Sequence, residues 1–451
     1  MNTLFGTDGI RGIANSYPVE PSTILKVAMA TAHCFMNGAH RHRVIIGKDT
    51  RLSGYMVEPA LTAGFVSMGM DVFLVGPLPT PAVSMLTQSL RGDIGIMISA
   101  SHNPYHDNGI KFFDSSGSKL SDDMQKKIAD FVANEQMMDQ LAPPTQLGRT
   151  TRLDGAMGRY IEYVKSTFDT SLSLESLKIV VDCANGATYK TAPTVLWELG
   201  ADVIKIHDEP NGFNINDSCG AIDPHSLAQA VRTHKANLGI ALDGDGDRVV
   251  LVDEQGGIFD GDDILALLAK DRYAGKTFIN GHKPCVIGTV ISNVGLVSFL
   301  DTLGVRFHRA QVGDRHVFQH IQKCDADFGG ETSGHILFKE HGGIGDGLIA
   351  ALQALAAMLR LKLKASQALT LVQKLPQMHD NVCVDTKQKA KTKDIEEDVA
   401  YWRKKLGQHG MLVVRPSGTE PVIRITASSQ NEQTMKQAVR HIKQRLLEAN
   451  S

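Results

Sequence analysis

The chain has 451 residues, of which 42% are hydrophobic and 21% charged, and its formal net charge is −2. This composition is typical of a globular protein with a full core, and the length predicts roughly two to four domains. The balanced charge, with a pI of about 6.8, argues against the basic surface of a nucleic-acid-binding protein.

The six cysteines are far apart and form no CxxC pair, which argues against a zinc cluster or a disulfide framework. The start of the chain lacks the basic and apolar regions of a signal peptide. Residues 348–359 form the longest apolar stretch, which is too short to span a bilayer and predicts a core helix. We therefore expect a cytoplasmic protein with no membrane partner.

Short β-branched runs alternate with helical segments in the first part of the chain. We predict strands at 44–47, 72–75 and 94–98, with helices at 58–68 and 82–89 between them. The pattern recurs with strands at 178–182, 202–206, 238–242 and 249–252 and a helix at 189–199, and a third unit opens with a strand at 286–290. This order predicts mostly parallel sheets covered by helices.

The last 70 or so residues have a different pattern. Strands are predicted near 381–385, 411–414 and 422–427, which indicates an α+β fold with an antiparallel sheet. Two polar segments have the composition of domain boundaries: 135–151, which contains two adjacent prolines, and the Lys-rich 377–393.

The first candidate loop, ISASHNP at 98–104, follows a predicted buried strand and presents Ser101 at its carboxyl end. Ligand sites in open α/β sheets lie at this edge. A serine there can form a covalent phosphoester, although a capping serine in a simple turn is the alternative. A nucleophile elbow is excluded because Ser99 and Asn103 stand where that motif needs glycines.

The second loop, LDGDGDR at 242–248, alternates three aspartates with glycines. Carboxylates this close repel one another unless a cation holds them, and oxygen ligands favour Mg²⁺ or Ca²⁺. An EF-hand is excluded because Arg248 takes the place of its glycine and strands flank the loop. A solvated acidic turn is the alternative.

Two later loops carry polar groups suited to a sugar phosphate. The loop GGETSGH at 329–335 offers hydrogen-bonding groups for hydroxyls, and RPSGTEP at 415–421, with Arg424 beyond it, has the composition of an anion-binding nest. For each of them alone, a structural turn is at least as good an interpretation.

The four loops in this order resemble those of the α-D-phosphohexomutase superfamily across essentially the whole chain. The resemblance also includes the runs FGTDGIRG at 5–12, KDTRLSG at 48–54, DNGIKFF at 107–113 and GDR at 313–315. Two positions depart from the family pattern: Thr332 replaces a glutamine, and CGAID at 219–223 differs from the usual CGST.

The resemblance implies an α/β fold of three similar mixed-sheet domains plus a C-terminal α+β domain around a central cleft. Residues 1–150 would carry the phosphoserine loop, 151–257 the metal site, 258–374 the sugar-binding loop and 375–451 the phosphate-binding loop. It implies a phosphorylated Ser101, Mg²⁺ on Asp243, Asp245, Asp247 and a Ser101 phosphate oxygen, and catalytic roles for Lys111, Arg11 and His102. The substrate contacts that it implies are Glu331, Ser333, His335, Arg415, Ser417, Gly418, Thr419 and Arg424.

The implied reaction converts glucosamine 6-phosphate to glucosamine 1-phosphate through glucosamine 1,6-bisphosphate, with that compound or glucose 1,6-bisphosphate as activator. The product would feed UDP-N-acetylglucosamine and cell-wall synthesis. Mannose or glucose phosphates are alternative substrates. A noncatalytic Mg²⁺-dependent sugar-phosphate sensor and a phosphatase are alternatives of other classes. The expected partner is a small phosphosugar, and a homodimer is the assembly considered.

Overall fold

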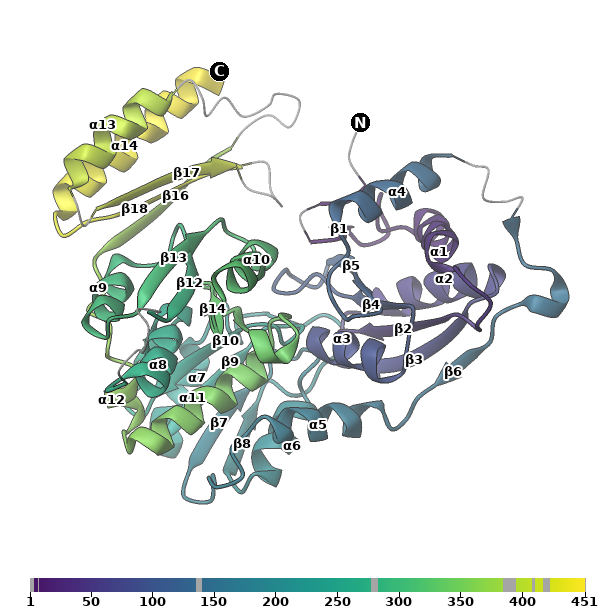
Figure 1. Cartoon of the computed structure of the whole chain (residues 1–451), viewed down its shortest axis with the longest axis horizontal. Helices are drawn as coiled ribbons and strands as arrows, with labels where there is room; N and C mark the ends of the chain where they lie inside the picture. Colours follow the sequence, from purple (N-terminus) through teal and green to yellow (C-terminus); the bar gives the residue numbers. More distant parts are fainter. Residues whose placement is uncertain are drawn as a thin grey trace. The chain divides into compact units, whose positions relative to one another are not determined.

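The computed structural model describes residues 4–6, 8–134, 140–276, 283–383, 395–407, 410–416 and 422–450. The chain divides into two compact units (Figure 1): Met1–Gly261 with Ser333–Ala368, and Asp262–Thr332 with Leu369–Ser451. No helix in the described ranges combines the length and apolarity needed to cross a membrane. All six cysteines are free.

The first unit begins with a six-stranded mixed sheet in the order β1-β5-β4-β2-β3-β6. Its strands are β1 (Ile10–Ile13), β2 (Arg43–Lys48), β3 (Asp71–Pro77), β4 (Ile94–Ile98), β5 (Asp107–Asp114) and β6 (Thr150–Arg152). Its helices are α1 (Pro21–Phe35), α2 (Gly54–Ser67), α3 (Thr80–Ser89) and α4 (Asp122–Ala133). Strands β2, β3, β4 and β6 form the parallel part of the sheet, and β5 pairs antiparallel with β4 and β1.

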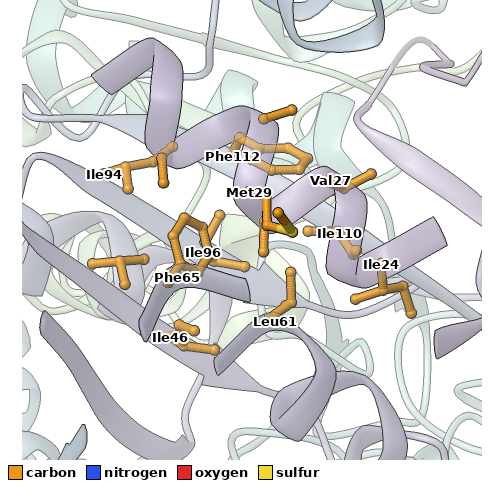
Figure 2. Packing of buried hydrophobic residues seen from close by; sticks show 14 of the residues in the cluster. Ile24, Val27, Met29, Ile46, Leu61, Phe65, Ile94, Ile96, Ile110 and Phe112 are labelled. Atoms are coloured by element: carbon orange, nitrogen blue, oxygen red, sulfur yellow. The ribbon is translucent and has the colours of Figure 1, made fainter. Parts of the chain in front are cut away.

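Side chains that alternate along the strands place helices on both faces of this sheet. Ile46 packs with Leu61 and Phe65 of α2 in the core between the sheet and helices α1 and α2 (Figure 2). The next residue, Gly47, faces the opposite side, where a side chain would collide with Val83 of α3. The sheet is thus covered on both faces, and its strand ends remain for loops that can bind ligands.

A second sheet follows, in the order β11-β10-β9-β7-β8. Its strands are β7 (Lys178–Asp182), β8 (Asp202–Ile206), β9 (Leu238–Leu242), β10 (Val249–Asp253) and β11 (Ile258–Phe259). The remaining helices of the first unit are α5 (Ala156–Ser166), α6 (Thr191–Glu198), α7 (His225–His234), α11 (Gly347–Leu361) and α12 (Ala365–Ala368). The unit also contains two 3₁₀ turns (Pro144–Gln146 and Lys339–His341) and the short strand β15 (Ile336–Phe338). Parallel pairing of β7 with β8 and β9 brings the carboxyl ends of these strands to one edge.

The second unit contains a parallel sheet and an antiparallel one. The parallel strands are β12 (Cys285–Thr289), β13 (Arg306–Ala310) and β14 (Phe328–Gly330), accompanied by α8 (Gly261–Tyr273), α9 (Val294–Thr302) and α10 (Asp314–Cys324). The antiparallel strands are β16 (Gln377–Cys383), β17 (Met411–Pro416) and β18 (Val422–Ser428), packed against α13 (Glu396–Leu406) and α14 (Glu432–Asn450).

The structure confirms the predicted α/β units and the antiparallel C-terminal sheet. The strands at 94–98, 178–182, 202–206 and 238–242 have the predicted bounds. Helix α2, by contrast, begins at Gly54, four residues before the predicted start, because the extra turn buries Val57. The segment predicted as a boundary at 135–151 ends in β6, which adds to the first sheet beside β3.

We expect Leu61→Ala to lower the free energy of unfolding by about 2–5 kcal/mol, because the deletion leaves a cavity in a close-packed core. Leu61 belongs to α2, has 0% exposure and packs in the core between this helix and the sheet. Thermal and denaturant unfolding would measure the change. The matched control is Leu141→Ala, at a residue that is 49% exposed, and an equal loss in both variants would contradict the packing shown in Figure 2.

Candidate active site

The serine loop follows β4 and places Ser101 in an unusual backbone conformation. Ser101 has φ of +51°, a left-handed conformation that costs free energy in a residue other than glycine and often marks a functional site. Its side chain is 2% exposed, and its Oγ donates a hydrogen bond of 2.8 Å to Asp243 Oδ2. The serine predicted as nucleophile therefore contacts the predicted metal loop.

Arg51, just after β2, holds the serine loop in this conformation. Its Nη2 donates to the carbonyl oxygens of Ser101 (2.9 Å) and Asn103 (2.8 Å), and its Nη1 donates to that of Asp107 (3.0 Å). Its Nε donates to Asp49 Oδ2 at 2.7 Å. A buried guanidinium is favourable only when its donors and its charge are satisfied, so this set of bonds fixes the position of Arg51 and of the loop.

The metal loop between β9 and β10 packs directly against the serine loop. A Cβ on Gly244 would lie 2.7 Å from the carbonyl oxygen of Ser101 and 2.6 Å from Asn216 Nδ2. That amide nitrogen donates to the same carbonyl oxygen at 2.9 Å. Glycine is therefore required at position 244 because the two loops approach too closely for a side chain.

The three aspartates of this loop form a compact, buried carboxylate group. Asp243 and Asp245 have 0% exposure and Asp247 has 4%, and one oxygen from each lies within 4.8 Å of the others. Asp245 Oδ1 is buried without a hydrogen-bond partner, which is costly unless a cation binds it. Burial and the neighbouring charges of Asp247 and Asp245 raise the pKa of Asp243 to about 8. This donor set fits Mg²⁺.

Lys111 on β5 provides the buried positive charge of the site. Its Nζ lies 2.7 Å from Asp245 Oδ2, 3.0 Å from Asp247 Oδ2 and 3.5 Å from Asp8 Oδ2. Burial alone would lower the pKa of Lys111, but these three carboxylates raise it well above the ordinary value. The predicted catalytic lysine is thus an ammonium beside the metal loop.

The other predicted catalytic residues lie around Ser101. Arg11 on β1 has its Nη1 3.5 Å from Asn103 Oδ1 in the serine loop. The Nδ1 atom of His102 is 3.5 Å from Ser101 Oγ. Burial, with the positive charges of Arg248 and Arg11, lowers the pKa of His102 to about 3, so its imidazole is neutral in this arrangement.

His335, predicted as a sugar ligand, lies against the metal loop. It is 5% exposed, and its Nδ1 is 3.5 Å from Asp247 Oδ1. A Cβ on Gly345 would collide with its ring, so a glycine makes room for the imidazole. Ser333, two residues earlier, is exposed.

The second unit carries the remaining predicted substrate contacts. Glu331 accepts a hydrogen bond of 2.7 Å from the backbone N–H of Gly313. Arg415 on β17 is directly opposite Arg424 on β18. Burial and the charge of Arg424 lower the pKa of Arg415, and Glu331 opposes that shift. Opposed like charges favour an anion between them. The predicted contacts Ser417, Gly418 and Thr419 lie outside the described residues.

Sequence reasoning assigned no role to several residues that shape the site, namely Asp8, Asp49, Arg51, Thr80 and Asn216. Thr80, for example, donates a hydrogen bond from its Oγ1 to the Asp245 carboxylate of the metal loop. A signal for Arg51 was present in the sequence. The run 48–54 follows a predicted strand just as the serine loop does, and carboxyl ends of neighbouring parallel strands meet at one edge.

Family models match nearly the whole chain in four segments. The models describe the α/β/α domains I, II and III of phosphoglucomutase/phosphomannomutase, at residues 2–139, 158–257 and 260–375, and its C-terminal domain at 381–444. The chain belongs to the phosphoglucomutase/phosphomannomutase family, a class of phosphohexomutases and therefore of isomerases.

Curated relatives identify the branch of that family. The chain is 52% identical over 437 residues to phosphoglucosamine mutase of Rhodospirillum centenum, covering 95% of this chain and 92% of the relative. It is 50% identical over 438 residues to phosphoglucosamine mutase of Parvibaculum lavamentivorans, covering 97% of each. Within the family, the chain belongs to the phosphoglucosamine mutases.

Solved structures share the fold at low sequence identity. A phosphoglucomutase/phosphomannomutase family protein from Burkholderia thailandensis matches with a TM-score of 0.79 at 20% identity, covering 100% of this chain and 98% of that one. The N-acetylphosphoglucosamine mutase of Aspergillus fumigatus, in complex with GlcNAc-6P and magnesium, matches with a TM-score of 0.69 at 16% identity, covering 99% and 96%.

We expect Asp245→Asn to weaken binding of Mn²⁺, an EPR-visible substitute for Mg²⁺, by at least about tenfold, because an amide ligand lacks the carboxylate charge. EPR or calorimetric titration would measure this. The control is Asp223→Asn, which changes a carboxylate outside the metal loop that contacts the exposed His225 ring at 2.7 Å. Equal Mn²⁺ affinity in the wild type and in Asp245→Asn would show that the metal does not bind at this loop.

We also expect Arg51→Lys to reduce mutase kcat by about a hundredfold with little change in KM, because a lysine cannot hold the serine loop and small misplacements of a nucleophile are costly. The control is Arg41→Lys, which changes an exposed arginine bonded to Asp71. A rise in KM with normal kcat would show that Arg51 acts on substrate binding instead.

Proposed function

We propose that the chain interconverts glucosamine 6-phosphate and glucosamine 1-phosphate by phosphoryl transfer through Ser101. The observation that carries the proposal is the 2.8 Å hydrogen bond from Ser101 Oγ to Asp243 in the carboxylate group. It brings a nucleophile, a candidate metal site and the Lys111 ammonium together in one unit. The sugar assignment is supported by the names of the curated relatives.

In the first half-reaction, the O1 hydroxyl of glucosamine 6-phosphate attacks the phosphorus of phosphorylated Ser101. A bond forms between O1 and phosphorus, the bond from phosphorus to Ser101 Oγ breaks, and the proton of the sugar hydroxyl ends on Oγ. The products are glucosamine 1,6-bisphosphate and free serine. In that free state the Ser101 hydroxyl donates a hydrogen bond to Asp243 Oδ2, which is the arrangement observed here.

In the second half-reaction, the bisphosphate turns and its 6-phosphate returns to Ser101. A bond forms between Oγ and that phosphorus, the bond from phosphorus to O6 breaks, and O6 gains the proton. Glucosamine 1-phosphate leaves. While the bisphosphate turns, the phosphate that is not reacting must stay bound to the protein. We assign this role to Arg415 and Arg424, which lie opposite each other on β17 and β18, because guanidinium pairs bind phosphate well. Ser417, Gly418 and Thr419 would complete this phosphate site.

Charge neutralisation is the main requirement of phosphoryl transfer. The trio Asp243, Asp245 and Asp247 would hold Mg²⁺, which when bound supplies Lewis-acid stabilisation of the phosphoryl oxygens. Lys111 keeps its positive charge beside Asp245, and Arg11 lies close to the serine loop. The neutral His102 can donate a hydrogen bond near Ser101. Glu331, Ser333 and His335 are proposed for the sugar hydroxyls.

The proposal predicts that Ser101→Ala lowers kcat by far more than about tenfold, even with glucosamine 1,6-bisphosphate supplied, because the variant lacks the hydroxyl that accepts the phosphoryl group. Coupled assays would measure turnover, and intact-protein mass spectrometry with peptide mapping would locate the phosphoryl group. The control is Ser116→Ala, at a serine in an exposed turn. Near-normal turnover of Ser101→Ala, or a phosphoryl group that never exchanges with substrate, would refute the covalent mechanism.

A further inference from the structure

A second cluster of ligating side chains lies at the other end of the strands that carry the active-site loops. His40 and His42 precede β2, and Asp93 precedes β4. These are neighbouring parallel strands, paired from Val44 with Ile94 to Lys48 with Ile98. Figure 1 shows β2 and β4 side by side in the first sheet. The cluster is therefore at the amino ends of the strands whose carboxyl ends lead to Arg51 and Ser101.

The three side chains converge on one point. His40 Nε2 is 2.7 Å and His42 Nδ1 is 3.2 Å from Asp93 Oδ1, and all three ligand atoms lie within 4.8 Å of one another. Ligands about 2.0–2.1 Å from a tetrahedral zinc are separated by about 3.3 Å. Small side-chain rotations would therefore bring these atoms to zinc-binding distances.

The ligand types select a transition metal over the Mg²⁺ of the active site. Imidazole nitrogens bind Zn²⁺, Ni²⁺ and Cu²⁺, whereas Mg²⁺ and Ca²⁺ prefer oxygen. A metal that binds here would replace the contacts between the imidazoles and Asp93, and each ring would then carry its proton on the nitrogen that faces away from the metal.

The surroundings leave room and charge balance for a cation. The nearby Arg41 guanidinium donates to both oxygens of Asp71, at 2.7 and 2.9 Å, so its charge is compensated. The other oxygen of Asp93 accepts the Arg43 backbone N–H at 2.7 Å, which orients the carboxylate. A cavity of about 400 Å³, lined in part by His40, His42 and Met68, leaves space for water beside the two imidazoles.

We propose that His40, His42 and Asp93 form a site for a divalent transition metal such as Zn²⁺, distinct from the catalytic metal site. The metal ties the amino ends of β2 and β4 together and so stabilises the sheet that carries the active-site loops. It takes no part in phosphoryl transfer. His42 and Asp93 supply ligands from a mostly buried position, and His40, with a side chain 59% exposed, closes over the metal from the surface.

The test is calorimetric titration of the full, tag-free chain with Zn²⁺ in the presence of excess Mg²⁺, which keeps the aspartate trio occupied. We expect one zinc per chain at this site and a higher melting temperature with zinc, because a ligand that binds only the folded state stabilises it. His40→Ala should weaken that binding by at least about tenfold while mutase kcat is unchanged. His40 is the primary target because its side chain is exposed and contributes little to the packing of the fold.

The matched control is His225→Ala, which removes the one imidazole of an exposed pair with Asp223 at 2.7 Å. It should bind zinc as the wild type does. Cu²⁺ EPR adds a direct signature: coupling to two ring nitrogens in the wild type and to one in His40→Ala. Zinc binding that is unchanged by His40→Ala would overturn the proposal and would direct attention to Asp182, His207 and Cys219, a second group with ligand spacing.

Discussion

The ion pairs between the Lys111 ammonium and the carboxylates of Asp245 and Asp247 are the interactions on which the active site depends. Buried charges are tolerated only when they are paired and hydrogen-bonded. The three buried aspartates of the metal loop outnumber the one buried lysine that contacts them, and the part-exposed Arg248 lies 3.7 Å from Asp247 at the edge of the group. Burial, together with the charges of Asp247 and Asp245, raises the pKa of Asp243, and a divalent cation bound to the three carboxylates would offset both effects.

This charge cluster dictates how closely two loops from different sheets must approach. The serine loop follows β4 and the metal loop follows β9, so the chemistry requires direct contact between two loops that extend from different sheets. Gly244 permits the approach because it has no side chain. Arg51 fixes the serine loop by donating a hydrogen bond to the carbonyl oxygen of Ser101. The hydrogen bonds from Arg51 and Asn216 to the carbonyl oxygen of Ser101 offset the free-energy cost of its left-handed backbone conformation. Lys111 then reaches the carboxylates from β5, which is the antiparallel neighbour of β4.

Most of the fold, and the identity of the chemical groups, could be predicted from the sequence because both are local. Apolar β-branched runs predicted the bounds of β4, β7, β8 and β9, and the spacing of the aspartates indicated a cation site. The contacts between those groups could not be predicted. Arg51 looks like a surface residue in a polar run, yet it is 1% exposed. His335 belongs to a loop read as sugar-binding, but it contacts Asp247. Both facts depend on tertiary packing between distant segments: the place of the run 48–54 after a strand indicated that it lies at the same edge as the serine loop, but not that the Arg51 side chain is buried and bonded to that loop.

The two ends of the β2–β4 pair carry different chemistry for a physical reason. Carboxyl ends of parallel strands meet where loops can converge on a ligand, so oxygen ligands and cations for phosphate gather there. The amino ends receive the chain from helix α1 and from the turn after α3, and their loops are short. The loop before β2 places His40 and His42 two residues apart, and both rings contact the Asp93 carboxylate. The same pairing register that aligns Arg51 with the serine loop therefore also aligns this imidazole–carboxylate cluster, and a ligand that restrains one end of the two strands acts on the segment that positions the other.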